Sequence, residues 1–360
     1  MSKHPGRIKV ALIGCGAVAR LYYMPALREL ETAGWLEVVA LVDPVARHAA
    51  LLREAFPRAL AVSELSGLSQ HAFDLAIVAS PHSLHAAQSI HLLEAGVSVL
   101  CEKPMATTAD DASAMARAAA SSRGLLAIGL VRRFFPATQA IRGMLSQRML
   151  GDISSFEFSE GSASFGWPAA SRGYFDRQEA QGGVLMDIGV HALDLLQWWL
   201  GRPAIVAFAD DAMGGIEANC LIHCRLAGGA TGTLRLSRDC ALANRYTIRG
   251  TRGWLSWQAG DAGHFDFGLA NSSQVIDSGL RNQADASFER SFLDQLRNVV
   301  AALLGTEELR VPAAEGLASI ALIDDCYRQR SLMAMSWMQE REFERGRALH
   351  GGATSGPTAR

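Results

Sequence analysis

Long apolar runs are missing from this sequence of 360 residues. No stretch approaches the roughly 20 residues that a membrane helix needs, and the start shows no cationic segment followed by an apolar signal core. Lys and Arg are scattered rather than clustered, and the formal net charge is only -2. A surface that attracts nucleic acid or an anionic membrane is therefore not expected. We predict a soluble, cytoplasmic protein that binds neither.

Cysteine is also scarce, with six residues in the whole chain. Most of them lie in apolar runs, where a free Cys behaves as a small hydrophobic residue, so we expect reduced thiols. Cys220, His223 and Cys224 suggest a metal site. Residues 218–226 are predicted to form a strand, however, and side chains alternate between the two faces of a strand, so His223 would point away from both cysteines. We predict no metal.

Short β-branched apolar runs alternate with turns and amphipathic helices over the first 131 residues. This pattern is typical of a parallel sheet covered by helices on both faces, which is a doubly wound Rossmann domain. The expected strands span residues 8–13, 36–42, 73–79, 98–101 and 125–131. The expected helices span residues 44–56 and 83–95, and a third begins at Thr108, whose hydroxyl can cap it.

The pattern changes after about residue 150 to longer alternating strands joined by glycine-rich turns. Residues 218–236 and 246–257 are each expected to form a hairpin, which indicates an antiparallel sheet. Two helices, over residues 288–304 and 313–331, are expected to close this second domain. The predicted fold class is α/β, with an N-terminal Rossmann parallel sheet and a C-terminal α+β domain that has a large, mostly antiparallel open sheet.

The chain length also favours two domains, because single cores stop growing at roughly 250 to 300 residues. We predict an NAD(P)-binding domain over residues 1–131, a substrate-binding and oligomerisation domain over residues 132–340, and a disordered tail over residues 347–360. An open antiparallel sheet leaves a broad face to cover, so we expect a homodimer or homotetramer.

A glycine-rich turn directly follows the first expected strand. Its letters, G-C-G-A-V-A from Gly14, fit the G-x-G-x-x-A pattern that opens a helix in dinucleotide sites. Gly14 allows the tight turn, Gly16 lets a pyrophosphate approach the backbone, and the phosphates face the helix N-terminus. We predict cofactor contacts at Gly14, Gly16, Ala17 and Val18.

Asp43 ends the second expected strand, where a carboxylate can accept hydrogen bonds from a ribose diol and repel a 2′-phosphate. Its position favours NAD. Arg47 could instead pair with Asp43 or bind a 2′-phosphate, so NADP is kept as the alternative. The spacing of 43 - 16 = 27 residues from Gly16 exceeds the roughly 20 of the general pattern. An added helical turn around residues 22–25 would account for it.

Polar residues follow two further expected strands, at the carboxyl ends where open α/β sheets bind ligands. Lys103 can donate a charge-assisted hydrogen bond to a substrate oxygen and so stabilise alkoxide character while hydride leaves or arrives. For His82 and His85, capping or packing roles are open alternatives to cofactor contact. The residues predicted to contact the cofactor here are Ser80, Pro81, His82, His85, Glu102 and Lys103.

Asp187 and His191 lie four residues apart in a segment that introduces a helix, and hence on one helical face. His is the usual general acid or base near neutral pH, and a carboxylate one turn away can fix its tautomer. Such pairs are also common on solvent-facing helix surfaces, so a catalytic and a surface role are both open for the pair alone.

Polar and aromatic residues crowd the stretch 165–181, just before this helix. Aromatic faces beside hydrogen-bonding groups suit a sugar or cyclitol, and packing against the second sheet is the alternative. The residues predicted to bind the substrate are Arg133, Trp167, Tyr174, Asp187 and His191.

Four spaced motifs resemble the Gfo/Idh/MocA oxidoreductases, which include glucose-fructose oxidoreductase and inositol dehydrogenase. They are G-C-G-A-V-A from Gly14, S-P-H-S-L-H from Ser80, E-K-P from Glu102 and G-G-V-L-M-D-I-G-V-H-A-L-D from Gly182. The resemblance spans roughly residues 7–335. The E-K-P and D-x-G-x-H elements are specific in this order and spacing, whereas the glycine turn alone would be weak.

The resemblance implies that Lys103 and His191 are catalytic partners, that Asp187 supports them, and that the Lys103-Pro104 bond is cis. It implies hydride transfer between a nicotinamide cofactor and a secondary alcohol or ketone of a sugar, sugar derivative or cyclitol.

Two positions depart from the family pattern. His82 stands where the family usually has Asn, and Gln181 stands where a third Gly often precedes the glycine pair. Two other functions known among relatives are kept as alternatives. One is a sugar enzyme that uses NAD transiently, as a glycosidase or epimerase does without net redox change. The other is a nicotinamide-binding regulator without catalysis, which the combination of Lys103, Asp187 and His191 disfavours.

Overall fold

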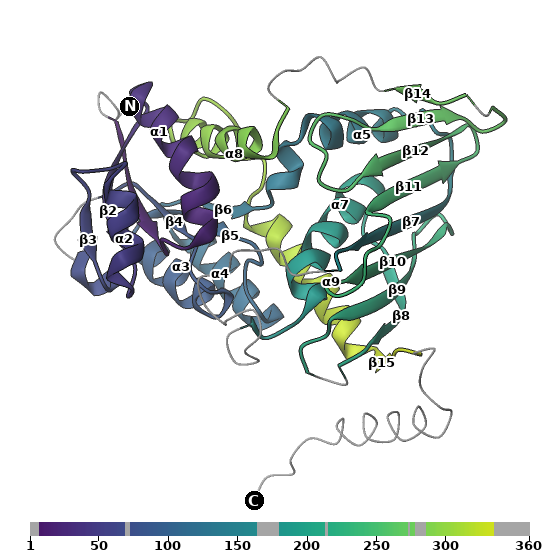
Figure 1. Ribbon diagram of the computed structural model, residues 1–360, viewed down its shortest axis with the longest axis horizontal. Coiled ribbons are helices and arrows are strands. Elements are labelled where there is room, and N and C mark those ends of the chain that lie inside the picture. Colours follow the sequence, from purple (N-terminus) through teal and green to yellow (C-terminus); the bar gives the residue numbers. More distant parts are fainter. Residues whose placement is uncertain are drawn as a thin grey trace, which may run out of the picture.

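Two sheets make up the core of the protein, with helices between them and around the first (Figure 1). The computed structural model describes residues 7–68, 73–163, 180–212, 215–272, 274–277 and 286–334. Within these residues one sheet has six strands and the other has nine. The predicted fold class is confirmed, because a parallel Rossmann sheet is followed by a large, mostly antiparallel sheet.

The first sheet is parallel throughout, in the order β3-β2-β1-β4-β5-β6. Its strands are β1 (Ile8–Ile13), β2 (Leu36–Val42), β3 (Leu60–Val62), β4 (Leu75–Val78), β5 (Ser98–Glu102) and β6 (Leu126–Gly129). Only β3 was not predicted, because it has just three residues and these are partly exposed. The order reverses between β1 and β4, and the carboxyl ends beside such a reversal are where open α/β sheets bind ligands.

Helices cover this sheet on both sides. They are α1 (Met24–Thr32), α2 (Ala46–Arg53), α3 (His85–Glu94) and α4 (Ala109–Ser121), with the short turns η1 (Ala19–Tyr23), η2 (Leu65–Leu68) and η3 (His82–Leu84). Thr108 caps α4 as predicted, since its Oγ1 accepts a hydrogen bond from the Asp111 amide at 3.1 Å. The turn expected around residues 22–25 is in fact π-helical: η1 runs into α1, with Pro25 in the first turn of α1, where proline is tolerated.

The second sheet has the order β14-β13-β12-β11-β7-β10-β9-β8-β15. The pairs β7–β10 and β8–β15 are parallel, and the other pairs are antiparallel. Its strands are β7 (Ile153–Gly161), β8 (Ala204–Asp210), β9 (Asn219–Arg225), β10 (Thr231–Ser237), β11 (Arg245–Gly250), β12 (Gly253–Gln258), β13 (Asp266–Leu269), β14 (Ile276–Asp277) and β15 (Arg330–Leu332). Both predicted hairpins are present, as β9–β10 and β11–β12.

Strand β9 alternates as predicted, with Cys220 and Cys224 buried and His223 exposed on the opposite face. In the described part of the chain, no group of three His, Cys, Asp or Glu side chains is placed to hold a metal ion.

Helices α5 (Pro136–Ser146), α7 (Val190–Leu200) and α9 (Ala313–Arg328) lie on the face of the second sheet that is turned toward the first (Figure 1). The short turns η4 (Val131–Phe134) and η6 (Leu185–Gly189) precede α5 and α7. Helix α8 (Phe288–Leu303) lies instead against α1 (Figure 1). The prediction that both final helices close the second domain is therefore wrong for α8. Its apolar residues Phe292, Leu296 and Val300 are buried in one cluster with Leu27 and Leu30 of α1.

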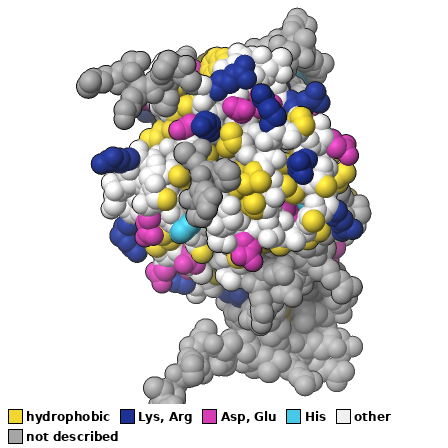
Figure 2. Space-filling view, turned by 90° about the vertical axis from the view of Figure 1, so that its left-hand side faces the viewer, with side chains coloured by type: hydrophobic (Ala, Val, Ile, Leu, Met, Phe, Trp, Pro, Cys, Tyr) yellow, Lys and Arg dark blue, Asp and Glu magenta, His cyan; other side chains and the backbone are white. Residues whose placement is uncertain are grey.

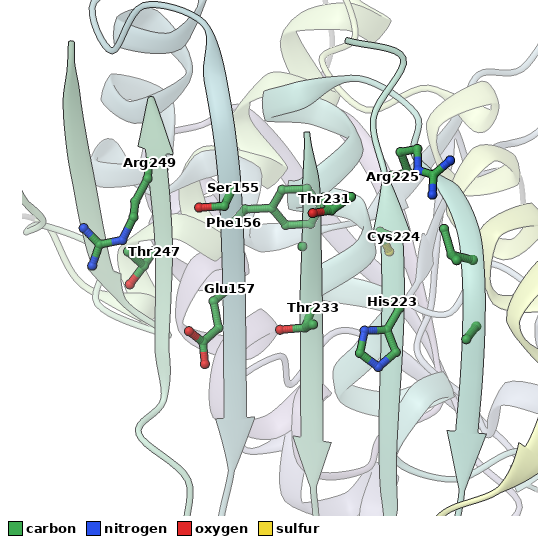
Figure 3. Close-up of a pocket in the computed structure, with 13 residues that line it drawn as sticks. Ser155, Phe156, Glu157, His223, Cys224, Arg225, Thr231, Thr233, Thr247 and Arg249 are labelled. Carbon is green, nitrogen blue, oxygen red and sulfur yellow. The ribbon is translucent and has the colours of Figure 1, made fainter. Parts of the chain in front are cut away.

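The opposite face of the second sheet carries no helix among the described residues (Figure 1). Strands β11, β7, β10 and β9 present mainly polar side chains there, around a shallow hollow (Figure 3). Glu157 and His223 flank Thr233 in one row across three of these strands.

Basic and acidic side chains are mixed over the face of the first domain that Figure 2 shows. None of the helices in the described ranges combines the length and the apolar character that a membrane span requires. The predicted limits of the two domains stay a prediction, and the tail over residues 347–360 lies outside the described residues.

Gly14 offers a test of this fold, because it has a left-handed φ of 86° and a Cβ there would lie 2.5 Å from the Ala79 carbonyl oxygen. Gly34 shares the left-handed φ, at 81°, but a Cβ there would meet nothing within 4 Å. Gly34→Ala should lower the free energy of unfolding by about 1 kcal/mol through backbone strain alone. Gly14→Ala should lower it by about 1–3 kcal/mol more, because of the clash. Urea denaturation measures both, and equal losses would contradict the packing described at Gly14.

Candidate active site

The glycine turn and Asp43 are tied together by backbone hydrogen bonds. The Asp43 carboxylate, on a residue only 7% exposed, accepts from the amides of Cys15 and Val45, each at 2.8 Å. His48 Nδ1 lies 3.3 Å from it, and Arg47, the predicted alternative partner, is exposed and makes no ion pair with Asp43. Asp43 therefore shapes the turn, and its contact with a ribose stays a prediction.

Space for a pyrophosphate is left above this turn, because a Cβ built on Gly16 would meet nothing within 4 Å. The backbone here therefore fits the phosphates of a dinucleotide, at the start of a helical segment whose free N–H groups favour anions.

Lys103 and Asp187 meet between the two sheets. Lys103 follows β5 of the first sheet, and its bond to Pro104 is cis, as the family resemblance implied. Its Nζ donates to Asp187 Oδ1 at 2.9 Å and to the Asp187 carbonyl oxygen at 3.0 Å. Asp187 lies on η6, directly before helix α7 of the second domain. The structure thus brings two predicted site residues 84 positions apart into direct contact.

Arg238, which follows β10, is a site residue that the sequence analysis missed. Its Nη2 donates to the Gly183 carbonyl oxygen at 3.0 Å and lies 3.3 Å from Asp187 Oδ2. Burial alone would raise the pKa of Asp187, but the Lys103 and Arg238 cations outweigh it and hold that pKa below its usual value. Asp187 is therefore a carboxylate clamped between two cations. In the sequence, Arg238 is a single arginine at a strand end and belongs to no motif, so its contact with Asp187 was not predicted.

His191 lies one helical turn further, on α7, and is 9% exposed. The predicted hydrogen bond from Asp187 to His191 is wrong: Asp187 faces Lys103 and Arg238, and His191 Nδ1 is buried without a hydrogen-bond partner among the described residues. Burial, together with the Arg132 and Lys103 cations, lowers the pKa of His191 well below its ordinary value. The imidazole is therefore neutral at neutral pH.

Arg132, a second missed residue, supplies part of that positive field. Its two terminal nitrogens donate to the Glu160 carboxylate at 2.8 and 2.5 Å, and the Tyr246 hydroxyl donates to the same carboxylate at 2.6 Å. Burial would raise the pKa of Glu160, but Arg132 holds it below its ordinary value. This bidentate pair fixes a cation beside His191.

Arg133, the predicted substrate-binding arginine, points elsewhere. It is 4% exposed and donates to Asp194 at 2.6 and 2.9 Å and to Glu315 at 2.7 Å. Its guanidinium also lies over the Trp198 ring, 5.2 Å from the centroid. Arg133 is thus a buried link between α7 and α9, and its predicted contact with substrate stays a prediction without support from these contacts.

Glu102 is likewise committed to the protein interior. The Tyr23 hydroxyl donates to its Oε1 at 2.7 Å, and the Lys103 amide donates to its Oε2 at 3.1 Å. Gln295 of α8 donates in turn to the Tyr23 hydroxyl at 3.1 Å. Burial raises the pKa of Glu102. With both oxygens occupied, Glu102 links the Lys103 segment to α8, and its predicted cofactor contact gains no support.

The segment after β4 holds the predicted histidines. His85 has no exposed surface, and its Nδ1 and Nε2 lie 2.8 Å from the Pro104 carbonyl oxygen and 2.9 Å from that of Ser80. Both ring nitrogens of His85 face backbone, so its predicted cofactor contact gains no support and stays a prediction. The His82 ring lies 5.7 Å away. Burial, then His85 and Lys103, lowers the pKa of His82 to about 3, so it is neutral.

Ser80 and Pro81 stay predictions as cofactor contacts. The Ser80 hydroxyl donates to Gln88 at 2.6 Å, and Pro81 is exposed. The predicted substrate residues Trp167 and Tyr174 lie outside the described residues.

The glycine pair before Asp187 is explained by Glu217, a third residue that the sequence analysis missed. A Cβ on Gly183 would collide with the Glu217 backbone. The buried Glu217 carboxylate accepts from the amides of Gly183 and Leu185, each at 3.0 Å, and from the Tyr327 hydroxyl at 2.9 Å. It thus caps the turn that carries Asp187, where a negative charge is favoured.

Gln181 occupies the third position, where relatives often have Gly, and it has a left-handed φ of 50°. The Thr107 hydroxyl donates to its side chain at 2.6 Å, which links the segment after Lys103 to the one before Asp187.

Comparison with known proteins supports the arrangement. The family model described as "Oxidoreductase family, NAD-binding Rossmann fold" matches residues 8–130, and "GFO/IDH/MocA C-terminal domain" matches residues 138–256. The chain is 30% identical over 258 residues to dTDP-3,4-didehydro-2,6-dideoxy-alpha-D-glucose 3-reductase of Actinomadura kijaniata, covering 69% of this chain and 74% of that one. It is 32% identical to D-glucoside 3-dehydrogenase of Escherichia coli over 55% of each chain.

The chain spans about half the length of the first curated relatives it matches. Among solved structures, the WlbA dehydrogenase of Bordetella pertussis in complex with NADH and UDP-GlcNAcA has a TM-score of 0.77 at 22% identity, covering 90% of this chain and 96% of that one. At this identity the likeness concerns the fold. The two matched family domains and the two sheets together establish that the chain belongs to the Gfo/Idh/MocA oxidoreductase family.

Proposed function

We propose that this protein transfers hydride between a nicotinamide cofactor and a secondary alcohol or ketone of a sugar, sugar derivative or cyclitol. The observation that carries the proposal is the contact of Lys103 with Asp187 beside His191, at the carboxyl ends of the first sheet. Several relatives are named as dehydrogenases or reductases of sugars, which supports the substrate class.

For the cofactor we propose NAD, with NADP as the alternative. The turn from Gly14 through Val18 would hold the pyrophosphate, and Asp43 would accept from the ribose diol. The segment from Ser80 to His82 would line the nicotinamide end. When bound, the nicotinamide supplies or accepts the hydride.

Lys103 is proposed to act on the reacting oxygen. Its ammonium donates a hydrogen bond there and stabilises the negative charge that grows on that oxygen. Asp187 holds the ammonium in place through the 2.9 Å contact. Arg238 keeps Asp187 ionised, so the pair stays charged while the substrate binds.

His191 is proposed to move the proton. As a neutral imidazole it can accept the proton of a substrate hydroxyl in the oxidative direction and return it in the reductive direction. The nearby cations Lys103 and Arg132 keep it neutral until it receives that proton.

Substitution of the two proposed catalytic residues tests this function. Lys103→Met and His191→Gln should each lower kcat/KM by about 100- to 10,000-fold, because each removes a group that acts on the reacting oxygen. Nicotinamide absorbance is followed with a panel of sugars and cyclitols and with the matching keto sugars, using NAD and NADP. Lys9→Met, at an exposed lysine of β1, is the control and should retain activity. Unchanged turnover in both variants would overturn the assignment. Reduced nicotinamide that stays bound after turnover would favour the transient-NAD alternative.

Cofactor binding is tested at Gly16. Gly16→Ala should raise the Kd of NAD at least about tenfold with little change in Tm, because the new methyl group enters the pyrophosphate space and touches no protein atom. Gly228→Ala is the matched control, since Gly228 also has nothing within 4 Å and lies in the β9–β10 turn of the other sheet. Calorimetric titration measures both, and native protein should bind NAD more tightly than NADP. Unaltered NAD affinity in Gly16→Ala would place the cofactor elsewhere.

The open face of the second sheet is proposed to pair with a second copy of the chain. A two-fold axis along β10 would set Glu157 over the partner subunit's His223, because both flank Thr233 in one row. The Glu157 carboxylate then faces an imidazole that can donate a hydrogen bond to it.

Thr233→Arg should convert this dimer to a monomer that keeps its fold, because a bulky cation at the centre of the face separates the copies. Sedimentation velocity at micromolar concentration measures the state, with the exposed Arg47→Glu on the first domain as control. Native protein that sediments as a monomer would refute the proposal.

A further inference from the structure

His85 is buried between the two segments that the proposed site depends on. It is the first residue of α3 and has no exposed surface. One ring nitrogen lies 2.8 Å from the carbonyl oxygen of Pro104, the residue directly after Lys103. The other lies 2.9 Å from the carbonyl oxygen of Ser80, in the segment after β4. A single imidazole therefore spans the ends of two neighbouring strands.

The chemistry of these contacts is specific, because a backbone carbonyl only accepts hydrogen bonds. Burial lowers the pKa of His85, while the Pro104 and Ser80 carbonyls oppose that shift. A neutral ring donates from one nitrogen only, whereas the cation donates from both. The Pro104 bond forms both in the neutral Nδ1–H tautomer and in the cation. The Lys103-Pro104 segment is thus tied to α3 in either state.

We propose that His85 is the positioning residue of Lys103: its Nδ1–H bond to the Pro104 carbonyl fixes the backbone from which the catalytic ammonium extends. The inference rests on the proposed role of Lys103. It gives the buried ring a role that needs no contact with the cofactor.

The link from ring to ammonium is short. Pro104 is bonded directly to Lys103, whose Nζ must meet Asp187 at 2.9 Å across the gap between the sheets. The Lys103 amide is held from the other side by Glu102 at 3.1 Å. Loss of the Pro104 tie frees one side of this segment, and a misplacement of about 1 Å at a reacting centre can cost about 100-fold in rate.

His85→Phe tests the tie, because it keeps a flat ring and removes both nitrogens. We expect kcat per folded molecule to fall about 10- to 100-fold with little change in the KM of the nicotinamide. Tm should fall as well, because a buried backbone carbonyl loses its hydrogen-bond donor. His85→Gln, which retains an N–H donor, should recover part of the loss. His91→Phe is the control, since His91 is exposed on the same helix, and it should leave kcat unchanged. A lower Tm with an unaltered kcat per folded molecule would mean a merely structural role and would overturn the proposal.

A double substitution at His85 and Lys103 distinguishes failure of the positioning role from failure of the proposed function. If His85 acts through Lys103, His85→Phe should lower the residual rate no further in a Lys103→Met protein. Independent, multiplying losses would refute the positioning role and leave the proposed function intact. A Lys103→Met protein with full activity would refute the function itself.

The tautomer gives a readout on the native protein that needs no variant. A long-range ¹H–¹⁵N correlation spectrum of histidine-labelled protein should report His85 Nδ1 as protonated at neutral pH. An unprotonated Nδ1 would overturn the proposal even if every variant at this position failed to fold.

Discussion

The ion pair of Lys103 with Asp187 is the contact on which the arrangement of the site depends. Its two side chains come from different sheets and remain only 17% and 16% exposed. At that burial an ion pair stabilises only when further groups satisfy its charges, and removal of either partner leaves a costly unpaired charge. Those further groups are present: Arg238 contacts the second oxygen of Asp187, and Glu217 caps the turn that carries it. Within the second domain, the Asp187 carboxylate is thus positioned both by Arg238 and by the turn that Glu217 caps. These contacts do not depend on Lys103.

The charged side chains around this ion pair act on the neighbouring histidines and on any oxygen bound beside them. Lys103, Arg238 and Arg132 are cations, whereas Asp187 and Glu160 are the anions that contact them. Two neutral imidazoles, His82 and His191, lie within the field of Lys103. Such a field opposes protonation of a resting histidine and favours an oxygen that gains negative charge. A site of this kind suits the interconversion of an alcohol and a ketone, in which alkoxide character develops on one oxygen.

The sequence predicted the parts of the fold that depend on local pattern. Strands β1 and β2, the Thr108 cap and both hairpins follow from periodicity and turn residues, and the positions of Lys103 and Asp187 follow from motifs. What it missed depends on tertiary packing. Arg132 and Arg133 are adjacent residues of the same type in the short turn η4. Arg132 pairs with Glu160 and Arg133 pairs with Asp194, and this difference depends on tertiary packing. Helix α8 has an ordinary amphipathic pattern. Such a pattern predicts that one face of the helix is buried, but it does not predict which domain buries that face. His85 was assigned to the cofactor from its motif, although burial gives it backbone partners.

The misjudged link between Asp187 and His191 has a geometric cause. A spacing of four residues places two side chains together on an α-helix, but Asp187 lies in the π-helical turn η6 and His191 in the α-helix that follows. A π-helical turn bonds residue i to i+5 and is wider, so side chains four apart no longer meet as they do on an α-helix. A second π-helical turn, η1, follows the glycine turn. Its residues account for part of the long sequence spacing between Gly16 and Asp43. Both π turns adjoin the proposed site, where such turns are frequent, and η6 directs Asp187 toward Lys103 rather than His191. The contact between the two domains thus involves a residue of a π-helical turn.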